Sequence, residues 1–365
     1  MNRLFFLLLA PFLLLVSGSA RLSAQVQTFS WQNDQREYIL HLPANHDGTP
    51  PIVFYLHGLG ENVATIDNNY NFSKIANDYG WAVVVPQAKN LGMGTMWSAA
   101  LVNSDVDDVG FLLALLDTLL VQHQLDPDSV FFTGFSMGGF MTHRMAIEHG
   151  DRITACAPIS GLIPIAITSL TPVSPVRLLH IHGTNDFVVG YDGGSQAFNM
   201  TLGLGVEAIL DYWQSVNSCS GLPIVDTLPD LKNDGLKFIH YTYNCGTDLQ
   251  HLKVVGGTHT LYFNEAQYDV SYWSVIHDFF VGNNGQSGVE DHEMGDFKVW
   301  PNPSSGLFHV EMDKNAEVQV IDMSGRVVFS GKFLAGNAQI DLRQMPDGLY
   351  LLKAAGRTVT KLVKE

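Results

Sequence analysis

The chain has 365 residues, which is more than one ordinary domain needs and leaves room for a large core plus a small additional domain. Hydrophobic residues make up 46% of it and charged residues 15%, a composition that excludes a disordered chain. The net charge of −16 argues against nucleic acid as a partner, because so acidic a surface repels phosphate backbones.

The first segment has the pattern of a secretory signal peptide. A basic start at Arg3 precedes an apolar run over residues 4–16, and small residues follow it. The run is too short for a comfortable membrane span, so residues 1–24 are predicted to be a signal peptide. Cleavage after Ala20 and cleavage after Ala24 both fit, and an uncleaved anchor is the alternative.

Residues 25–282 are predicted to form one domain in which strands alternate with helices. Strands are expected at 52–57, 82–86, 130–133, 178–181 and 252–255, and helices at 105–123, 137–149, 207–216 and 265–280. Ser104 or Asp105 is expected to cap the first of these helices. Such alternation predicts the α/β class, with a mostly parallel sheet and helices on both faces.

The three cysteines bear on export, because disulfides persist in oxidising compartments. Cys219 and Cys245 both lie in polar, turn-rich sequence and are the candidate disulfide. Cys156 lies in an apolar stretch and is predicted to be a buried free thiol. No pair of cysteines has zinc-site spacing.

The composition changes after residue 282. Small polar and acidic residues over 283–296 predict a linker. Residues 297–365 then read as short β segments separated by Gly, Asn and Asp turns, which predicts a small β-sandwich.

Residues 134–138, Gly-Phe-Ser-Met-Gly, follow a predicted strand and open a predicted helix. A serine at a sharp strand-to-helix turn needs small neighbours, and G-x-S-x-G is the pattern of such a nucleophile elbow. The helix N-terminus favours negative charge near the serine. Ser136 is therefore the candidate nucleophile, and an ordinary glycine-rich turn is the alternative.

A serine hydroxyl needs a base to become nucleophilic, and after a nucleophile elbow the acid and the histidine follow in that order. Asp186 comes after a strand and a glycine and is the candidate acid, which would hold the tautomer of the base. Asp192 and Asp211 are weaker competitors. His259 lies in a loop of glycines and threonines after a later strand and is the candidate base.

Acyl transfer also needs donors for the developing oxyanion. The backbone N–H of Met137, directly after the nucleophile, is one expected donor. Leu59, in the loop after an early strand, is expected to supply the second, while His57 is expected to be structural.

Three aromatic residues are candidates for a substrate pocket, with packing as the alternative for each. They are Trp97, Tyr191 and Tyr262.

Metal binding is not expected. The acidic residues Asp105, Asp107 and Asp108 suit a solvated helix start favoured by the helix dipole. His180 and His182 alternate along a predicted strand but lack a third ligand at a suitable spacing, so a structural role is predicted for them.

Six motifs together resemble secreted polyhydroxybutyrate-depolymerase-like and feruloyl-esterase-like proteins over most of residues 30–282. They lie at 56–58, 97–98, 105–111, 134–139, 182–186 and 256–259. The resemblance implies an esterase of the α/β-hydrolase fold with the triad given above, no metal and no cofactor. Such proteins often have a disulfide where Cys219 and Cys245 lie. The chain departs from the family at Leu59, often a cysteine, and at residues 258–261, where Thr-His-Thr-Leu replaces Gly-His-Thr-Trp.

The tail resembles a type IX secretion C-terminal sorting domain. The resemblance rests on residues 299–303, 320–328, 345–350 and 361–364. It implies export through the periplasm and the outer membrane by the type IX machinery, with the product secreted or attached to the cell surface. A carbohydrate-binding module is the alternative for the tail.

The resemblances imply hydrolysis of carboxylic esters through an acyl-enzyme. The expected substrates are feruloyl or acetyl esters of plant polysaccharide, or a polyester. A peptidase on the same fold is an alternative, disfavoured because no propeller-like domain is present. An inactive surface binding protein is another, disfavoured by the complete triad.

Overall fold

The computed structural model describes residues 25–44, 46, 48–92, 94–102, 104–264, 266–282, 298–312, 316–322, 326–354 and 357–365. The predicted signal peptide, residues 1–24, and the predicted linker, residues 283–296, lie outside them. The chain divides into two compact units, one ending at Asn283 and the other beginning at Asn284. Within the described ranges, no helix has both the length and the apolar character needed to cross a bilayer.

The first unit is built on a ten-stranded sheet in the order β1-β2-β4-β3-β5-β6-β7-β12-β11-β10. The strands, in that order, are Gln27–Trp31, Asp34–His41, Ala82–Pro86, Ile52–Leu56, Val130–Phe135, Ala155–Ile159, Arg177–Gly183, Leu249–Val255, Lys237–Tyr243 and Ile224–Thr227. The central strands from β4 to β12 run parallel, and two strands at each edge pair antiparallel. The prediction of a mostly parallel sheet is confirmed.

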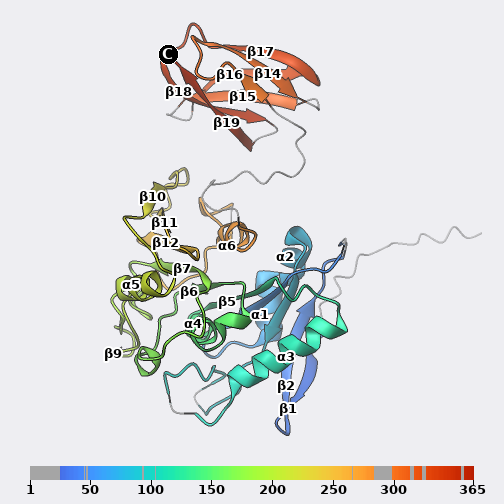
Figure 1. Cartoon of the computed structure of the whole chain (residues 1–365), viewed down its shortest axis with the longest axis vertical. Coiled ribbons are helices and arrows are strands. Elements are labelled where there is room, and N and C mark those ends of the chain that lie inside the picture. Colours follow the sequence, from blue (N-terminus) through green and yellow to red (C-terminus); the bar gives the residue numbers. More distant parts are fainter. Residues whose placement is uncertain are drawn as a thin grey trace, which may run out of the picture. The chain divides into compact units, whose positions relative to one another are not determined.

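Helices cover both faces of this sheet (Figure 1). They are α1 (Val63–Tyr70), α2 (Phe72–Tyr79), α3 (Asp108–Gln122), α4 (Met137–His149), α5 (Val206–Val216) and α6 (Tyr272–Phe280). Apolar residues of α3, α4 and α5 pack on one face, and those of α1, α2 and α6 pack on the other. Alternate residues of each buried strand supply the two cores, since side chains alternate across a strand.

Two expected helix starts are wrong. Helix α3 is capped by Asp107, whose side chain accepts a hydrogen bond from the Gly110 amide at 2.8 Å, and not by Ser104 or Asp105. Helix α6 begins at Tyr272 and not at residue 265. The preceding residues form a loop, in which the Asp269 carboxylate accepts amide hydrogen bonds from a neighbouring turn.

Asp108 is also not the solvated residue that was predicted. Its carboxylate is fully buried and lies 2.7 Å from the Arg36 guanidinium on β2. It also accepts the Ser98 amide at 2.7 Å. A buried carboxylate needs such partners, so Asp108 joins α3 to the sheet.

A disulfide joins Cys219, just after α5, to Cys245, just after β11. Cys156 on β6 is buried and free. Both predictions about the cysteines are confirmed.

The second unit consists of two antiparallel sheets with one shared core. One sheet contains β13 (Lys298–Trp300), β14 (Leu307–Met312) and β17 (Gly336–Asp341), and the other β16 (Val327–Phe333), β15 (Ala316–Asp322), β18 (Gly348–Ala354) and β19 (Arg357–Lys364). Phe308 and Val310 from the first sheet pack with Val318, Val320 and Leu352 from the second. The predicted β-sandwich is confirmed.

Candidate active site

Ser136 lies at the turn between β5 and α4, with a backbone φ of 54°. Non-glycine residues rarely adopt such angles, and the turn is held by close packing. A Cβ at Gly138 would overlap the Leu56 carbonyl oxygen, and a Cβ at Gly134 would lie 2.6 Å from the Gly138 backbone. Both glycines are therefore required to bring the serine turn this close to β3.

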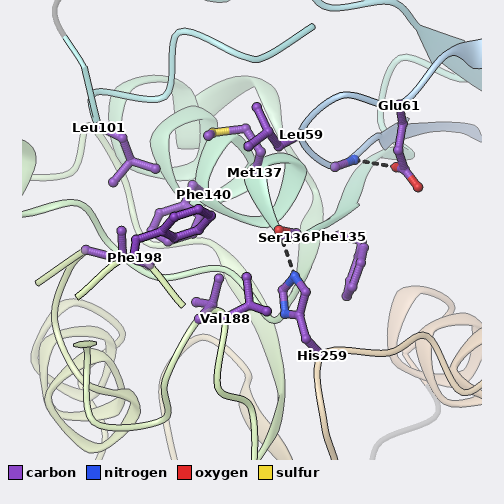
Figure 2. Close-up of a pocket in the computed structure, with 13 residues that line it drawn as sticks. Leu59, Glu61, Leu101, Phe135, Ser136, Met137, Phe140, Val188, Phe198 and His259 are labelled. Atoms are coloured by element: carbon purple, nitrogen blue, oxygen red, sulfur yellow. Dashed lines mark hydrogen bonds between the residues drawn. The ribbon is translucent and has the colours of Figure 1, made fainter. Parts of the chain in front are cut away.

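The structure brings together the three side chains predicted as a triad. His259 Nε2 lies 2.9 Å from Ser136 Oγ (Figure 2). His259 Nδ1 lies 2.7 Å from Asp186 Oδ2. The imidazole ring also packs on Phe135, with 4.7 Å between ring centroids. In this order the histidine can accept the serine proton on Nε2 while the carboxylate holds the proton on Nδ1.

Asp186 is held in place by the loop that follows it. Its Oδ1 accepts the Val188 amide at 3.0 Å and the Val189 amide at 2.8 Å, which leaves Oδ2 for His259. The side chain of Asp186 is fully buried. Asp192 and Asp211, the weaker candidates for the acid, make no such contact with His259 among the described residues.

The turn over residues 58–61 carries Leu59, whose amide is the predicted second oxyanion donor. The Gly58 amide donates to Glu61 Oε2 at 2.6 Å, and the Gly60 amide donates to the Thr95 carbonyl at 2.8 Å. Among the described residues, none accepts a hydrogen bond from the amide of Leu59 or of Met137. Both amides are therefore available to an oxyanion on the substrate.

Glu61 itself lines the cavity beside the serine. Burial raises the pKa of its carboxyl, against the opposing effects of the Gly58 hydrogen bond and of His259. The sequence offered no motif for this residue, although its place in the turn after Leu59 could have suggested it.

The cavity at Ser136 has a volume of about 290 Å³. Its lining is mainly apolar and comprises Gly58, Leu59, Glu61, Leu101, Phe135, Ser136, Met137, Phe140, Val188, Val189, Phe198, Leu202 and His259. Figure 2 shows Leu101, Phe140, Val188 and Phe198 on one side of Ser136 and Glu61 and Phe135 on the other.

None of the three aromatic residues predicted for the pocket lines this cavity. Trp97 is fully buried and donates to the His57 carbonyl at 3.0 Å. The Tyr191 hydroxyl contacts His251 Nε2 at 2.9 Å, and the Tyr262 hydroxyl accepts the Thr258 amide at 2.9 Å. Each ring serves packing and a local hydrogen bond, so the pocket prediction was wrong for this cavity.

Three buried histidines, His182, His180 and His143, form a hydrogen-bonded row that begins at the loop after Asp186. His182 Nε2 donates to the Val189 carbonyl at 2.8 Å, because a carbonyl can only accept. Its Nδ1 therefore accepts from His180 Nε2 at 3.3 Å, and His180 Nδ1 accepts from His143 Nε2 at 3.3 Å. Burial lowers the pKa of all three, to about 3 for His143. The row is neutral, which fits the structural role predicted for His180 and His182.

His57 is likewise structural in this arrangement. Its Nδ1 donates to the Gly58 carbonyl at 2.7 Å, and its Nε2 accepts the Ala88 amide at 3.0 Å. Burial lowers its pKa to about 4, so the ring stays neutral and supports the turn that carries Leu59.

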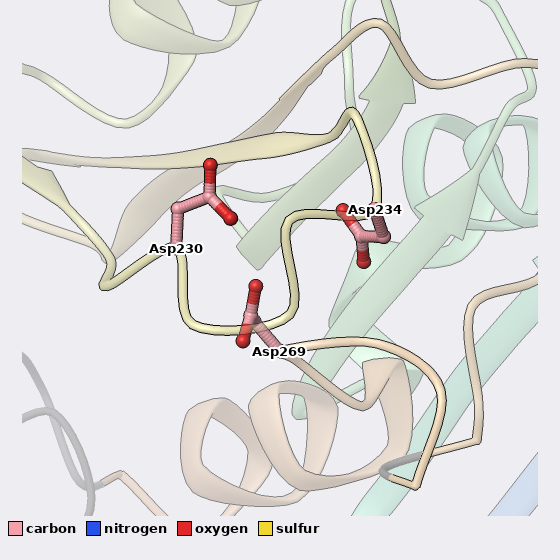
Figure 3. Close-up of side chains that lie close together, drawn as sticks. All are labelled: Asp230, Asp234 and Asp269. Carbon is pink, nitrogen blue, oxygen red and sulfur yellow. The ribbon is translucent and has the colours of Figure 1, made fainter.

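Three carboxylates of the first unit lie close together and do not line the cavity at Ser136. Asp230, Asp234 and Asp269 have oxygen atoms within 4.8 Å of one another (Figure 3). Each also accepts a backbone amide of the same turn, such as Asn233 to Asp230 at 3.2 Å and Leu236 to Asp234 at 2.9 Å. They hold that turn, and the cluster by itself does not indicate a metal.

Comparison with known proteins bears on both units. Residues 298–365 match the family described as "Secretion system C-terminal sorting domain". A chain with this domain is directed to secretion or to attachment at the cell surface, as predicted.

The chain is similar to named esterases. It is 27% identical over 261 residues to a bifunctional acetylxylan esterase/xylanase from Neocallimastix patriciarum, covering 70% of this chain and 36% of that protein. It is 31% identical over 180 residues to a putative esterase from Nocardia uniformis subsp. tsuyamanensis, covering 47% and 51%. Feruloyl esterase B from Piromyces equi is 26% identical over 201 residues, covering 53% and 37%. The chain thus spans between about a third and a half of the length of these curated relatives.

A solved structure supports the fold. The acetyl xylan esterase from Aspergillus awamori superposes with a TM-score of 0.50 at 16% identity, covering 70% of this chain and 99% of that one. The likeness agrees with the parallel sheet and the flanking helices described above. The first unit therefore has the α/β-hydrolase fold, the chain is similar in sequence to named esterases, and residues 298–365 match a secretion-system C-terminal sorting domain.

Proposed function

We propose that the chain is a serine carboxylic ester hydrolase in which Ser136 is the nucleophile, His259 the base and Asp186 the acid. The observation that carries this proposal is the continuous contact from Ser136 Oγ through the His259 ring to Asp186, at 2.9 and 2.7 Å, beside an apolar cavity. The names of the relatives point to the same class of reaction.

The geometry supports a two-step reaction. His259 Nε2 takes the Ser136 proton as Oγ attacks the ester carbonyl, and the amides of Leu59 and Met137 stabilise the oxyanion. The intermediate collapses to an acyl-serine, and the alcohol leaves with the proton from His259. Water then repeats the sequence and releases the acid.

The relatives suggest feruloyl or acetyl esters of plant polysaccharide as candidate substrates, because relatives named for these esters match this chain. A polyester is a second candidate. It is favoured by the exposed apolar side chains at the cavity, Leu59 at 41% and Phe198 at 56% exposure. We further propose that the unit from residue 25 to 282 is catalytic and that the tail addresses it to type IX secretion.

The test is hydrolysis of p-nitrophenyl acetate, p-nitrophenyl butyrate and methyl ferulate by the full chain and by Ser136→Ala. We expect the substitution to abolish turnover with all three, because Ser136 carries the only hydroxyl or thiol among the described residues that line the cavity. Activity that survives in folded Ser136→Ala would contradict the proposal. An inactive but folded native chain would turn attention to a peptidase or a binding role.

A further inference from the structure

One side of the cavity forms a chamber made by Leu101, Phe140, Val188 and Phe198 (Figure 2). The four side chains come from the segment before α3, from α4, from the loop after Asp186 and from the β8–β9 hairpin. None of the four carries a nitrogen or an oxygen. The chamber therefore offers dispersion contacts and apolar burial, with no side-chain partner for a polar group.

Phe198 is presented to the chamber by a well-anchored hairpin, with β8 at Gly194–Ser195 and β9 at Met200–Thr201. The Phe198 amide donates to Ser195 Oγ at 3.1 Å. The amides of Gln196 and Ala197 donate to the Phe187 carbonyl at 3.0 and 3.1 Å. The backbone is thus held on both sides while the ring, 56% exposed, closes one wall of the chamber.

The size of the cavity limits what enters it. An apolar protein cavity of about 150 Å³ can hold benzene. The whole cavity here is about 290 Å³, which suffices for one ring with a short connecting chain but not for a run of sugar units. A polymeric part of the substrate must therefore lie outside.

This size limit indicates which half of the ester, the acyl group or the alcohol, binds in the cavity. The alcohol half leaves with a proton from His259, and in polysaccharide esters it is the polymer. The small half that remains bound to Ser136 is the acyl group.

We propose that the chamber binds the acyl group and selects acyl groups that are apolar and larger than acetyl, with Phe198 as a specificity-determining residue. The inference rests on the proposed ester hydrolysis. A ring hydroxyl placed in the chamber would lose its water without gaining a side-chain partner. The chamber therefore ranks unsubstituted aryl acyl groups above both feruloyl and acetyl, the two acyl groups that the names of the relatives suggest.

The test compares four esters with the full chain by following proton release. Ethyl 3-phenylpropanoate and its isomer 3-phenylpropyl acetate put the same ring in the acyl half or in the alcohol half. Ethyl 3-(4-hydroxyphenyl)propanoate adds only a ring hydroxyl, too far from the carbonyl to change its reactivity. Ethyl acetate lacks the ring.

We expect kcat/KM for ethyl 3-phenylpropanoate to exceed that of each other ester by about tenfold or more, from apolar burial and from the unpaired hydroxyl. Equal values for the two isomers, or a higher value for 3-phenylpropyl acetate, would overturn the assignment of the chamber to the acyl group. An equal or higher value for the hydroxylated ester would overturn the selection of apolar acyl groups.

Phe198→Ala and Phe187→Ala form a matched pair, because Phe187 is 53% exposed in the neighbouring loop after β7 but does not line the cavity. The readout is the ratio of kcat/KM for ethyl 3-phenylpropanoate to that for ethyl acetate, which does not depend on the fraction of folded protein. Phe198→Ala is expected to lower this ratio at least fivefold, and Phe187→Ala to keep it. An unchanged ratio in Phe198→Ala would overturn the role of this residue. Ser136→Ala separates this outcome from a failure of the proposed function, because activity that survives there is not catalysis by Ser136.

Discussion

Glu61 is a single residue that fixes the geometry of a whole turn. Its side chain accepts the Gly58 amide at 2.6 Å, and its carbonyl accepts the Thr95 hydroxyl at 2.7 Å. The Leu59 amide lies between these two attachments. Glu61 therefore acts as a positioning residue for the proposed oxyanion donor rather than as a group that reacts.

Replacing Glu61 tests that role. Glu61→Ala is expected to lower kcat about 10- to 100-fold with little change in KM, because loss of one oxyanion donor costs about 10²- to 10³-fold and here the donor is only loosened. Glu61→Gln keeps an acceptor oxygen and is expected to stay within about threefold of the native chain. Steady-state kinetics on one ester measures both. Equal losses in the two variants would show that the charge matters and not the hydrogen bond.

At the scale of elements, the loop after β7 connects the acid to the row of buried histidines. His182 Nε2 donates a hydrogen bond to the Val189 carbonyl, and the Val189 amide donates one to the Asp186 carboxylate. The same loop supplies Val188 to the wall of the cavity. Strand β7 thus positions the acid and the cavity wall together.

His182→Leu is expected to lower both activity and stability. The substitution leaves the Val189 carbonyl and the His180 N–H buried without partners, which costs about 1–3 kcal/mol for each unpaired group. His182→Gln can still donate to Val189 and is expected to recover most of kcat. Chemical denaturation and kcat on the same preparations provide the measurement. If Gln and Leu behaved alike, His182 would serve packing alone.

The disulfide links the end of α5 to the end of β11 across 26 residues of sequence. Closing a loop of this length restricts the unfolded chain and stabilises the fold by about 3.5 kcal/mol in the chain-entropy account. The free energy of unfolding of the double variant Cys219→Ser/Cys245→Ser is therefore expected to be lower by about that amount. The variant should unfold at a lower denaturant concentration as a result. The buried Cys156→Ala variant is the control for loss of a thiol. If a reducing agent left the free energy of unfolding of the native chain unchanged, the expectation would be contradicted.

At the scale of the whole molecule, the buried histidines make stability depend on pH. Burial lowers the pKa of His57 to about 4 and that of His143 and His251 to about 3, from an ordinary value of 6.5. Below pH 6.5 the unfolded chain binds more protons than the folded chain. The free energy of unfolding therefore falls with falling pH, down to the folded pKa values, by up to about 1.4 kcal/mol per unit and per histidine.

Urea unfolding followed by tryptophan fluorescence at pH 7, 6, 5 and 4.5 measures this slope. His143→Leu removes one titrating ring whose Nδ1 has no hydrogen-bond partner in the described structure, so it is the matched variant. The slope of its free energy of unfolding against pH is expected to be smaller by the contribution of one proton, about 1.4 kcal/mol per pH unit. A free energy of unfolding that stays constant from pH 6.5 to 4.5 would refute the account.

Local patterns in the sequence predicted those parts of the site that depend on local geometry. The turn at Ser136 follows from the steric need for glycine at 134 and 138, and the loops of Asp186 and His259 follow from strand ends. The cavity wall has no such pattern, because Leu101, Phe198 and their neighbours come from separate loops. Asp108 was misjudged for the same reason, since its partner Arg36 lies 72 residues earlier.

The three side chains of the proposed triad lie far apart in the sequence, with a separation of 123 positions between Ser136 and His259. The strand before His259, β12, joins the sheet beside β7, late in the chain. Contacts between such distant segments form only after slow loop closure, so they come late in folding. A nascent or partly folded chain therefore carries the proposed nucleophile long before it carries the proposed base. Under the proposed mechanism it cannot hydrolyse esters until the last parallel strand is in place.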